Sequence, residues 1–340
     1  MPLLEVEELA VSFETPSGTV RAVDGLSLTI ERGERVGIVG ESGSGKSVTA
    51  LAILGLVPAS GHVTAGRLAF EGDELLTRSE RQLQRWRGRH ASMVFQDPLS
   101  SLNPFLRVGR QVAETLEVHL ELSRAEAGRR AAELLAGVGI ADAGSRLRDY
   151  PHQFSGGMRQ RVAIAIAMAC APELLIADEP TTSLDVTVQA QILDVLAQLS
   201  TASGTAVILI THDLGVVAGF CDRLLVMYAG RIVESGPTDA VVGEPQHPYT
   251  RGLLESIPRL RGPLPARLRS VEGSPPEIGA LLPGCAFAPR CPLAMPVCLE
   301  ETPRLEPVPG EGQAHRVVAC HAVARGYVPV TGTGNGEVAR

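Results

Sequence analysis

The sequence lacks any apolar stretch long enough to cross a membrane. Of its 340 residues, 44% are hydrophobic, but the longest helix-like apolar run, "VAIAIAMACA", is well short of the roughly 20 residues that a spanning helix needs. The amino terminus, "MPLLEVEELAVSFE", has neither the basic start nor the apolar core of a signal peptide. We therefore expect a cytosolic chain without a transmembrane segment or signal peptide.

An excess of positive charge is also lacking, as is any internal repeat. Lys and Arg number 31 against 38 Asp and Glu, which gives a formal net charge of −7. Such a balance does not favour nucleic acid as a partner. One arginine cluster could face anions, although a solvated helix face is the favoured interpretation; it comprises Arg78, Arg81, Arg85, Arg87 and Arg89.

Paired C-x2-C motifs, typical of common zinc sites, are missing as well, yet four of the six cysteines gather near the carboxyl end. They are Cys285, Cys291, Cys298 and Cys320, spaced C-x5-C-x6-C-x21-C. This spacing also differs from the common ferredoxin patterns. Cytosolic thiols stay reduced, so the cluster indicates metal before disulfide. Cys170 and Cys221 lie singly in apolar contexts and are predicted to be core thiols.

The hydrophobic pattern that is present predicts an α/β protein. Apolar strands are expected at "ELLIAD", "AVILIT" and "RLLVMY", with "DVTVQAQILDVLAQLS" as a helix between the first two. Residues 3–39 are expected to form β-structure, and residues 76–150 to be mostly helical with arginine-rich faces. Proline and glycine then become dense, so we expect an irregular segment over 244–325 and a loose tail over 326–340.

The stretch "GESGSGKS" fits the P-loop pattern G-x-x-x-x-G-K-[ST] and lies between an apolar strand and a helix. Its glycines would let backbone N–H groups surround phosphate oxygens, while Lys46 reaches the β- and γ-phosphates and Ser47 ligates Mg²⁺. A glycine turn beside a chance Lys-Ser pair is the alternative. The predicted ATP-binding residues here are Gly40, Glu41, Ser42, Gly43, Ser44, Gly45, Lys46, Ser47 and Val48.

Two acidic residues end the predicted strand "ELLIAD". Asp178 could support Mg²⁺ or its water, and Glu179 could act as general base toward an attacking water. A solvated turn would also place two acids at a strand end, but the P-loop in the same chain favours the catalytic interpretation.

A further set of motifs resembles the ATP-binding subunits of ABC transporters. In order along the chain, "VSF", "FQDP", "FSGGMRQR", "TTSLD" and "LITHD" are similar to that family's motifs. Phe154 and Met158 depart from its L-S-G-G-Q signature but leave the serine and both glycines in place. The resemblance implies a P-loop ABC ATPase domain, with a RecA-like parallel sheet, an antiparallel β subdomain and a helical insert at about 97–171, all within residues 1–243.

The resemblance also implies roles for individual residues. Phe13 would stack on adenine, Gln96 would contact Mg²⁺ and the attacking water, and His212 would contact the γ-phosphate. The signature residues Ser155, Gly156 and Gly157 would bind the ATP of a second subunit, and Asp185 would link the two sites. A buried core phenylalanine and a structural histidine are the alternatives for Phe13 and His212.

The stretch "EPQHPYTRGLL" resembles the junction into the C-terminal extension of oligopeptide and dipeptide importer ATPases, of the D type. This implies ATP-driven peptide import with two membrane permease subunits, a second related ATPase and, indirectly, an extracytoplasmic binding protein. The chain would lie on the cytoplasmic face of the membrane. Nickel and other small-solute importers share this branch. Soluble ABC ATPases acting on DNA or ribosomes are the more distant alternative, disfavoured by the acidic charge and single P-loop.

The same resemblance bears on the cysteines. D-type ATPases carry the pattern "C-x-F-x-x-R-C-P" in association with a [4Fe–4S] cluster, and Cys285, Cys291, Cys298 and Cys320 match it here. The competing interpretation is a zinc ion held by Cys285, Cys291 and Cys298 together with either Cys320 or His321. Ordinary buried thiols are the third interpretation. A structural cluster predicts that Cys291→Ser destabilises residues 244–325 and leaves ATP binding nearly intact.

Overall fold

The computed structural model describes residues 1–16, 18–97, 101–182, 184–256, 271–276, 279, 283–308 and 316–327. Within these ranges, no helix combines the length and the apolar character that crossing a membrane requires. Most of the tail expected over 326–340 lies outside the described residues.

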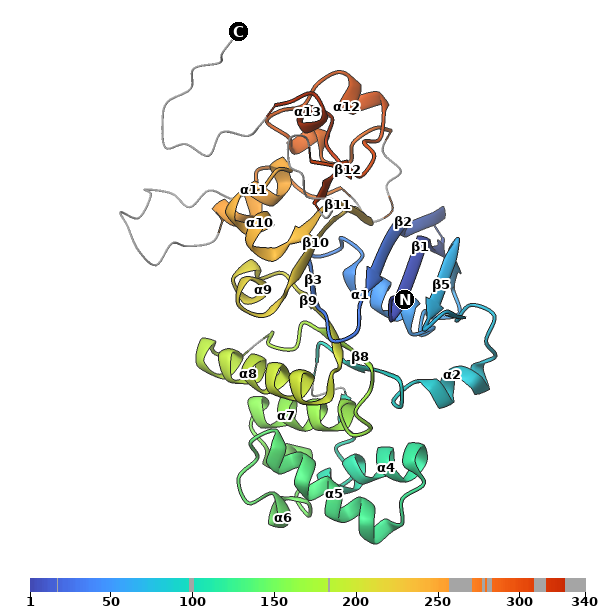
Figure 1. Ribbon diagram of the computed structural model, residues 1–340, viewed down its shortest axis with the longest axis vertical. Helices are drawn as coiled ribbons and strands as arrows, with labels where there is room; N and C mark the ends of the chain where they lie inside the picture. Colours follow the sequence, from blue (N-terminus) through green and yellow to red (C-terminus); the bar gives the residue numbers. More distant parts are fainter. Residues whose placement is uncertain are drawn as a thin grey trace.

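A mixed sheet forms the centre of the molecule (Figure 1). Its strand order is β12-β13-β11-β10-β3-β9-β8-β7, in which the run from β10 to β7 is parallel. The strands are β3 Arg35–Val39, β7 Ala91–Val94, β8 Leu174–Asp178, β9 Ala206–Thr211, β10 Arg223–Tyr228, β11 Arg231–Pro237, β12 Glu306–Pro307 and β13 Val317–Val318. This confirms the predicted parallel core and its strands at "ELLIAD", "AVILIT" and "RLLVMY".

Strand alternation divides the hydrophobic core into two clusters, one on each face of the sheet. In β9, Val207 and Leu209 belong to one cluster, while Ile208 and Ile210 belong to the other. Every residue of β8 and β9 is buried, as expected for parallel strands that are covered on both faces. The carboxyl ends of these strands, where the acidic residues follow, are thereby held in fixed positions.

A second, antiparallel sheet covers one side of the central sheet (Figure 1). Its strands are β1 Leu4–Thr15, β2 Gly18–Ile30, β4 Gly61–Thr64, β5 Arg67–Phe70 and β6 Asp73–Glu74. The pairing of β1 with β2 confirms that residues 3–39 are largely β-structure.

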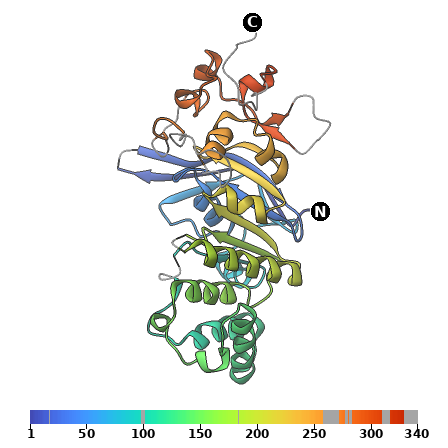
Figure 2. The same cartoon turned by 90° about the vertical axis from the view of Figure 1, so that its left-hand side faces the viewer.

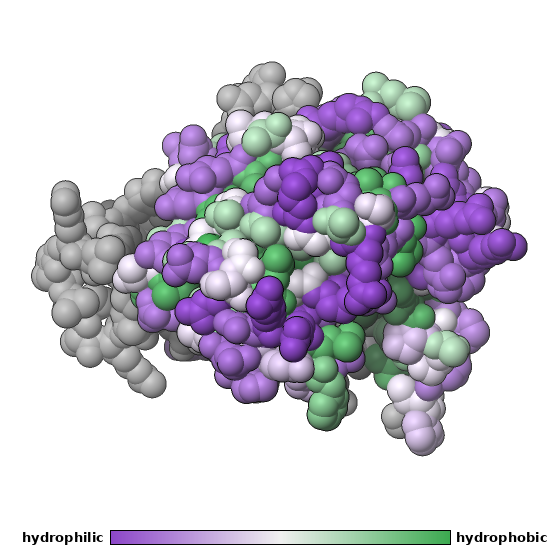
Figure 3. All heavy atoms as spheres, turned by 90° about the horizontal axis from the view of Figure 1, so that it is seen from below, coloured by the Kyte–Doolittle hydropathy of each residue, from purple (hydrophilic) through white to green (hydrophobic). Residues whose placement is uncertain are grey.

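Helices pack around the sheets, and several gather at one end of the molecule (Figures 1 and 2). The helices are α1 Lys46–Ile53, α2 Glu80–Trp86, α4 Val108–Leu120, α5 Arg124–Gly137, α6 Ala143–Arg146, α7 Gly156–Ala167, α8 Val186–Ser203, α9 Leu214–Phe220, α10 Thr238–Gly243, α11 Pro248–Glu255, α12 Val297–Glu300 and α13 His321–Ala324, with 3-10 turns η1 Pro151–Gln153 and η2 Ala288–Arg290. Helix α8 lies between β8 and β9 as predicted. The face at the helical end is mainly hydrophilic, with smaller apolar groups between (Figure 3).

The segment 76–150 is mostly helical, as expected, with α2, α4, α5 and α6, but Ala91–Val94 form β7, which pairs in parallel with β8. The expectation for the segment after residue 243 needs correction, because it is not wholly irregular: β12 and β13 extend the central sheet beyond β11. In both cases the strand is very short, so its own pattern is weak and the neighbouring strand decides its conformation.

The C-terminal segment is anchored to β11 through a buried polar cluster. Glu234, fully buried, accepts the backbone N–H groups of Gln246 and His247, both at 2.9 Å. Arg316, 1% exposed, lies 3.4 Å from the same carboxylate. Burial raises the pKa of Glu234, because it disfavours the charged carboxylate. The two N–H groups and Arg316 favour the charged form and offset part of this effect. The cluster holds the C-terminal segment against β11. Since β11 pairs with β10 and β10 pairs with β3, the segment lies near the loop that follows β3.

Candidate functional site

The P-loop connects β3 to α1, as its sequence context predicts. Gly45 precedes α1 with φ +100°, a conformation that favours glycine. A Cβ atom at Gly45 would lie 2.5 Å from the carbonyl oxygen of Ala22, and one at Gly40 would lie 2.2 Å from that of Met227. Both glycines are therefore required by close backbone contacts as well as by the turn. The loop and the start of α1 thus form the strand–loop–helix arrangement that the motif predicts, and phosphate binding there stays a prediction.

Lys46 folds back over this loop. Its Nζ donates to the carbonyl oxygens of Gly40 and Glu41, at 2.8 and 2.9 Å. Burial lowers the pKa of Lys46, while the carboxylates of Glu179, Asp178 and Glu41 act in the opposite direction. An ammonium group held by loop carbonyls can exchange them for phosphate oxygens with a small movement, which suits the predicted role.

Asp178 ends β8, and Ser47 lies in the first turn of α1. Burial raises the pKa of the Asp178 carboxyl, and the neighbouring Ser47 hydroxyl acts in the opposite direction. Asp178 is 5% exposed, and its Oδ1 atom has no hydrogen-bond partner among the described residues. A buried carboxylate oxygen without a partner, next to a serine hydroxyl, is a donor set that suits Mg²⁺. The residues present therefore fit the predicted magnesium site.

Glu179 is the point at which the predicted catalytic residues meet. Gln96 Nε2 donates to Glu179 Oε2 at 2.9 Å, and His212 Nδ1 lies 3.3 Å from Glu179 Oε1. Thr182, which the sequence analysis missed, donates its hydroxyl to Glu179 Oε2 at 2.9 Å. Glu179 itself adopts φ +45°, and its N–H donates to the carbonyl oxygen of Ile210. Three separate segments thus converge on one carboxylate whose backbone is strained and firmly held.

The signature motif begins α7. The Ser155 side chain accepts a hydrogen bond from the Met158 N–H at 3.3 Å, so it caps the helix. Gly156 and Gly157 lie close to the next helix, since a Cβ at Gly157 would be 2.7 Å from Val188 Cγ1. Asp185 caps that helix, α8, by accepting from the Val188 N–H at 2.9 Å. Figure 1 shows α7 well apart from α1, so the structure does not bring the signature to the chain's own P-loop.

Phe13 lies on β1 and is half-buried. Its ring packs against Gly61 of the neighbouring strand β4, because a Cβ at Gly61 would be 2.8 Å from Phe13 Cε1. The ring is only partly covered by the core cluster beneath it. The stacking of Phe13 on adenine stays a prediction.

The four clustered thiols lie near one another in the C-terminal segment. Burial raises the pKa of Cys291 to about 11, and the thiols of Cys320, Cys285 and Cys298 contribute to its environment. Cys285 N–H also donates to the carbonyl oxygen of Cys298 at 2.7 Å. Among the residues that the structure describes, however, no group of three or more His, Cys, Asp and Glu side chains is close enough to hold a metal ion.

The structure separates the two remaining thiols from this cluster. Cys221 is buried within the main core, as predicted. Cys170 is only half-buried, at the carboxyl end of α7, so the prediction of a core thiol is too strong for Cys170.

Two residues of the C-terminal segment reach the P-loop, and the sequence analysis missed both. The Tyr249 hydroxyl accepts the N–H of Glu41 at 2.8 Å, and Arg290 pairs with the Glu41 carboxylate. Both residues lie in stretches that carry the resemblance to importer ATPases, "HPYTRG" and "RCP". No local pattern could connect them to Glu41, which lies 208 and 249 residues away.

Comparisons with known proteins agree with this geometry. The ABC transporter family model matches residues 23–182, and the model for the oligopeptide/dipeptide transporter C-terminal region matches residues 233–298. The oligopeptide transport ATP-binding protein OppD of Salmonella typhimurium is 52% identical over 88% of this chain and 89% of its own length. The dipeptide transport ATP-binding protein DppD of Bacillus subtilis is 51% identical over 87% of this chain and 88% of its own.

Solved structures place the fold in the same class. The dimeric structure of a bacterial ABC transporter cassette superposes with a TM-score of 0.63 at 28% identity, covering 69% of this chain and 98% of that one. A cassette of another ABC transporter complex, from Clostridium perfringens, superposes with a TM-score of 0.60 at 31% identity, covering 72% of this chain and 91% of that one. The chain is therefore an ABC ATPase, of the class that couples ATP hydrolysis to transport.

Within this class the relatives are specific. The chain belongs to the family of ATP-binding subunits that carry the oligopeptide/dipeptide transporter C-terminal region.

Proposed function

We propose that this chain is the ATP-hydrolysing subunit of an importer for oligopeptides or dipeptides. The observation that carries the proposal is the identity of about half of its residues with OppD and DppD proteins over nearly the whole length, C-terminal region included. Nickel or another small solute is the second candidate. The residues of the site described above are assigned to ATP, so the uptake experiment below decides between the two solutes.

The geometry supports a distinct role for each residue of the ATP site. Lys46 leaves the loop carbonyls to bind phosphate, while Ser47, Asp178 and Gln96 hold the Mg²⁺ that neutralises phosphate charge. Glu179 accepts the proton of the attacking water, and His212 lies beside it to contact the γ-phosphate. Phe13 stacks on the adenine ring.

The signature serves a second subunit. Ser155, Gly156 and Gly157 begin a helix whose N-terminus attracts anions, and they lie apart from the chain's own P-loop. In the proposed dimer with a related ATPase, they bind the γ-phosphate held by the partner. Asp185 begins the adjacent helix and links the two sites.

Beyond that dimer, the proposed partners are two membrane permeases. An extracytoplasmic binding protein delivers the transported solute to them, and this chain lies on the cytoplasmic face of the membrane. The segment between Gln96 and α4 carries Phe105, which is 87% exposed. An exposed apolar ring on the segment that follows Gln96 suits a contact with a permease. We assign the nucleotide-binding domain to residues 1–243, with the helical insert at about 97–171, and the extension to residues 244–325.

We further propose that Cys285, Cys291, Cys298 and Cys320 hold a [4Fe–4S] cluster, which would staple the extension. Support comes from the chemistry of the donor set, four thiols of one segment that influence one another electrostatically, and from the small core there, in which Cys320 packs on Val308, Val318 and Val323. The described thiols do not form a metal-binding group as they stand, so binding of the cluster would have to draw them together. Anaerobic purification followed by iron, acid-labile sulfide and zinc analysis tests this. About four iron and four sulfide per chain are expected; stoichiometric zinc or neither metal would overturn it.

The transport proposal is tested by reconstitution. The chain is co-purified from its own cells with its membrane partners and placed in proteoliposomes. These proteoliposomes should take up peptides from a defined mixture of di-, tri- and pentapeptides when ATP is supplied. The same preparation with Glu179→Gln is the matched control. Peptide uptake that needs ATP and Glu179 is the expected result, whereas Ni²⁺ uptake without peptide uptake would favour the second candidate.

A further inference from the structure

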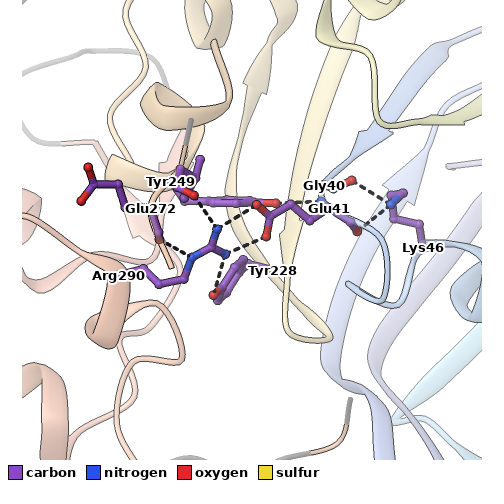
Figure 4. A network of polar contacts seen from close by, with 8 residues as sticks. Gly40, Glu41, Lys46, Tyr228, Tyr249, Glu272 and Arg290 are labelled. Atoms are coloured by element: carbon purple, nitrogen blue, oxygen red, sulfur yellow. Dashed lines mark hydrogen bonds and ion pairs between the residues drawn. The ribbon is translucent and has the colours of Figure 1, made fainter. Parts of the chain in front are cut away.

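The P-loop residue Glu41 is held from the C-terminal segment at both its backbone and its side chain (Figure 4). Arg290 makes two parallel bonds to the carboxylate, Nη1 to Oε2 at 2.7 Å and Nη2 to Oε1 at 3.0 Å. The Tyr249 hydroxyl accepts the Glu41 N–H at 2.8 Å. The side chain of Arg290 is only 4% exposed and that of Glu41 is 25% exposed. This is therefore a largely desolvated pair with bidentate geometry, the strong form of an arginine–carboxylate contact.

Arg290 is fixed independently of Glu41. Its Nε donates to the carbonyl oxygen of Glu272 at 2.9 Å, and Nη2 donates to that of Val271 at 3.2 Å. Nη1 also bonds the Tyr228 hydroxyl at 3.3 Å. Together with the two bonds to Glu41, these contacts use the full set of guanidinium donors. The guanidinium also lies 5.9 Å from the ring centroids of Tyr228 and Phe287. A side chain held in this way is preorganised and positions its partner instead of following it.

The position of Arg290 along the chain ties it to the thiols. It ends the 3-10 turn η2 and directly precedes Cys291, whose N–H donates to the carbonyl oxygen of Ala288 at 3.2 Å. The same short loop begins at Cys285. Any rearrangement of the loop between Cys285 and Cys291 therefore moves the guanidinium.

Glu41 transmits this contact to the phosphate site. Its carbonyl oxygen accepts Lys46 Nζ at 2.9 Å, and its carboxylate acts electrostatically on the same ammonium group. Without Arg290, an unpaired carboxylate would remain beside the place where a triphosphate binds, and its charge would repel the nucleotide.

We propose that Arg290 is a positioning residue for ATP binding: it neutralises and orients Glu41, and so makes the P-loop depend on the folded state of the thiol-bearing loop. This inference rests on the proposed ATP site. Arg290 could instead serve only to dock the extension, which would also explain the contact. In that case, however, a change at Glu41 would not restore the ATP affinity that is lost when Arg290 is replaced.

The test is a double-mutant cycle on the full-length chain, read as the Kd for ATP by equilibrium titration. Arg290→Gln should raise Kd about tenfold, within the range of couplings between contacting charged groups. Glu41→Gln removes the repelling charge and leaves the backbone contact to Lys46, so its Kd is the reference for the second half of the cycle. The double variant should return close to the Kd of Glu41→Gln. Arg290→Lys, which keeps the charge but not the two parallel bonds, should lie between Arg290→Gln and the wild type.

Controls separate the possible outcomes. Arg325→Gln, at an exposed arginine of the same segment, should bind ATP like the wild type. If the wild type binds ATP and Arg290→Gln binds it equally well, the inference fails and the proposed ATP site stands. If the double variant binds ATP as weakly as Arg290→Gln does, and proteolysis shows an opened extension, Arg290 has only a docking role and the inference also fails. A wild type that does not bind ATP would overturn the proposed site itself.

Discussion

Glu179 illustrates how single side chains define the chemistry of this site. Its carboxylate is contacted by Gln96, Thr182 and His212, which come from three different loops. A carboxylate that accepts two hydrogen bonds at Oε2, with the His212 ring beside Oε1, is aimed in one direction, and geometry is the first requirement of a general base.

Glu179→Gln keeps the shape of the side chain and removes the proposed general base. We expect the rate of ATP hydrolysis to fall by about 10²–10⁴-fold, with ATP binding nearly unchanged. Phosphate release and equilibrium ATP titration measure the two effects. Glu173→Gln, just before the opposite end of β8, is the matched control and should hydrolyse at the wild-type rate. Hydrolysis by Glu179→Gln at that same rate would exclude Glu179 as the base.

A second residue-scale prediction concerns acid stability. Burial lowers the pKa of His247 to about 3 from the usual 6.5, and its Nδ1 accepts the Tyr249 N–H at 3.0 Å. The folded protein therefore keeps this ring neutral at a pH where the unfolded chain protonates it. The stability that His247 contributes is full above about pH 6.5 and is lost progressively as pH falls toward 3.

His247→Asn retains an acceptor for Tyr249 and cannot titrate. Between pH 6.5 and pH 5, the wild type should lose about 2 kcal/mol of unfolding free energy more than this variant does. Urea unfolding at several pH values measures the difference, with His62→Asn, at an exposed histidine, as control. Parallel pH profiles for all three proteins would contradict the assignment.

Sequence reasoning placed correctly the features that are encoded locally. The P-loop between β3 and α1 and the acidic pair at the end of β8 each depend on a few adjacent residues, so their motifs predict where they lie. The capping by Ser155 and Asp185 was not foreseen. Arg290 and Tyr249 could not be assigned in this way. Their contacts with Glu41 exist only because β10, β11 and the extension are stacked beside β3, which is a tertiary arrangement.

At the scale of elements, the helix N-termini carry much of the proposed function. Ser155 caps α7 and Asp185 caps α8, and the two helices are packed so closely that Gly157 leaves no room for a side chain. Short strands were harder to foresee. The strand β7 has four residues within an arginine-rich stretch, and its pairing with β8 overrides a weak local pattern.

Ser155 combines a structural and a proposed binding role that two substitutions can separate. Ser155→Ala removes the cap and should cost about 1 kcal/mol of stability. Ser155→Asp restores a cap but brings a negative charge, so stability should recover while ATP-dependent association with the partner ATPase is lost. Thermal melts and sedimentation measure these effects. Ser123→Ala removes the equivalent cap of α5 and should lose stability alone; association of the Ser155→Asp protein at wild-type affinity would refute the trans contact.

At the scale of the whole molecule, the extension is continuous with the nucleotide-binding sheet. Glu234 of β11 is bonded to Gln246, His247 and Arg316, and β13 pairs with β11. The sequence indicated a proline-rich appendage but not this attachment, because Glu234 and Arg316 are 82 residues apart. The thiol loop and the P-loop therefore belong to one packed unit.

This continuity changes what we expect of Cys291→Ser. The thiol pattern alone predicts a loosened extension with ATP binding intact. Because Arg290 is adjacent and bonds Glu41, we now expect Cys291→Ser to raise the Kd for ATP toward that of Arg290→Gln. Limited proteolysis and ATP titration are the measurements, with Cys170→Ser as control. Faster cleavage of the extension with an unchanged Kd would support the earlier expectation and contradict the coupling.

The pairing of β13 with β11 also has a consequence for the solubility of shortened forms of the chain. In the intact protein, Glu234 and Ser235 are paired with Val318 and Val317, and the Ala319 N–H donates to the carbonyl oxygen of Val233. A chain that ended after α10 would leave β11 as an uncovered edge, with its backbone donors and acceptors exposed next to a buried apolar sheet. Such an edge is a template for pairing with another molecule. We therefore expect a chain that ends after α10 to aggregate more readily than the full-length chain, whatever the thiols bind.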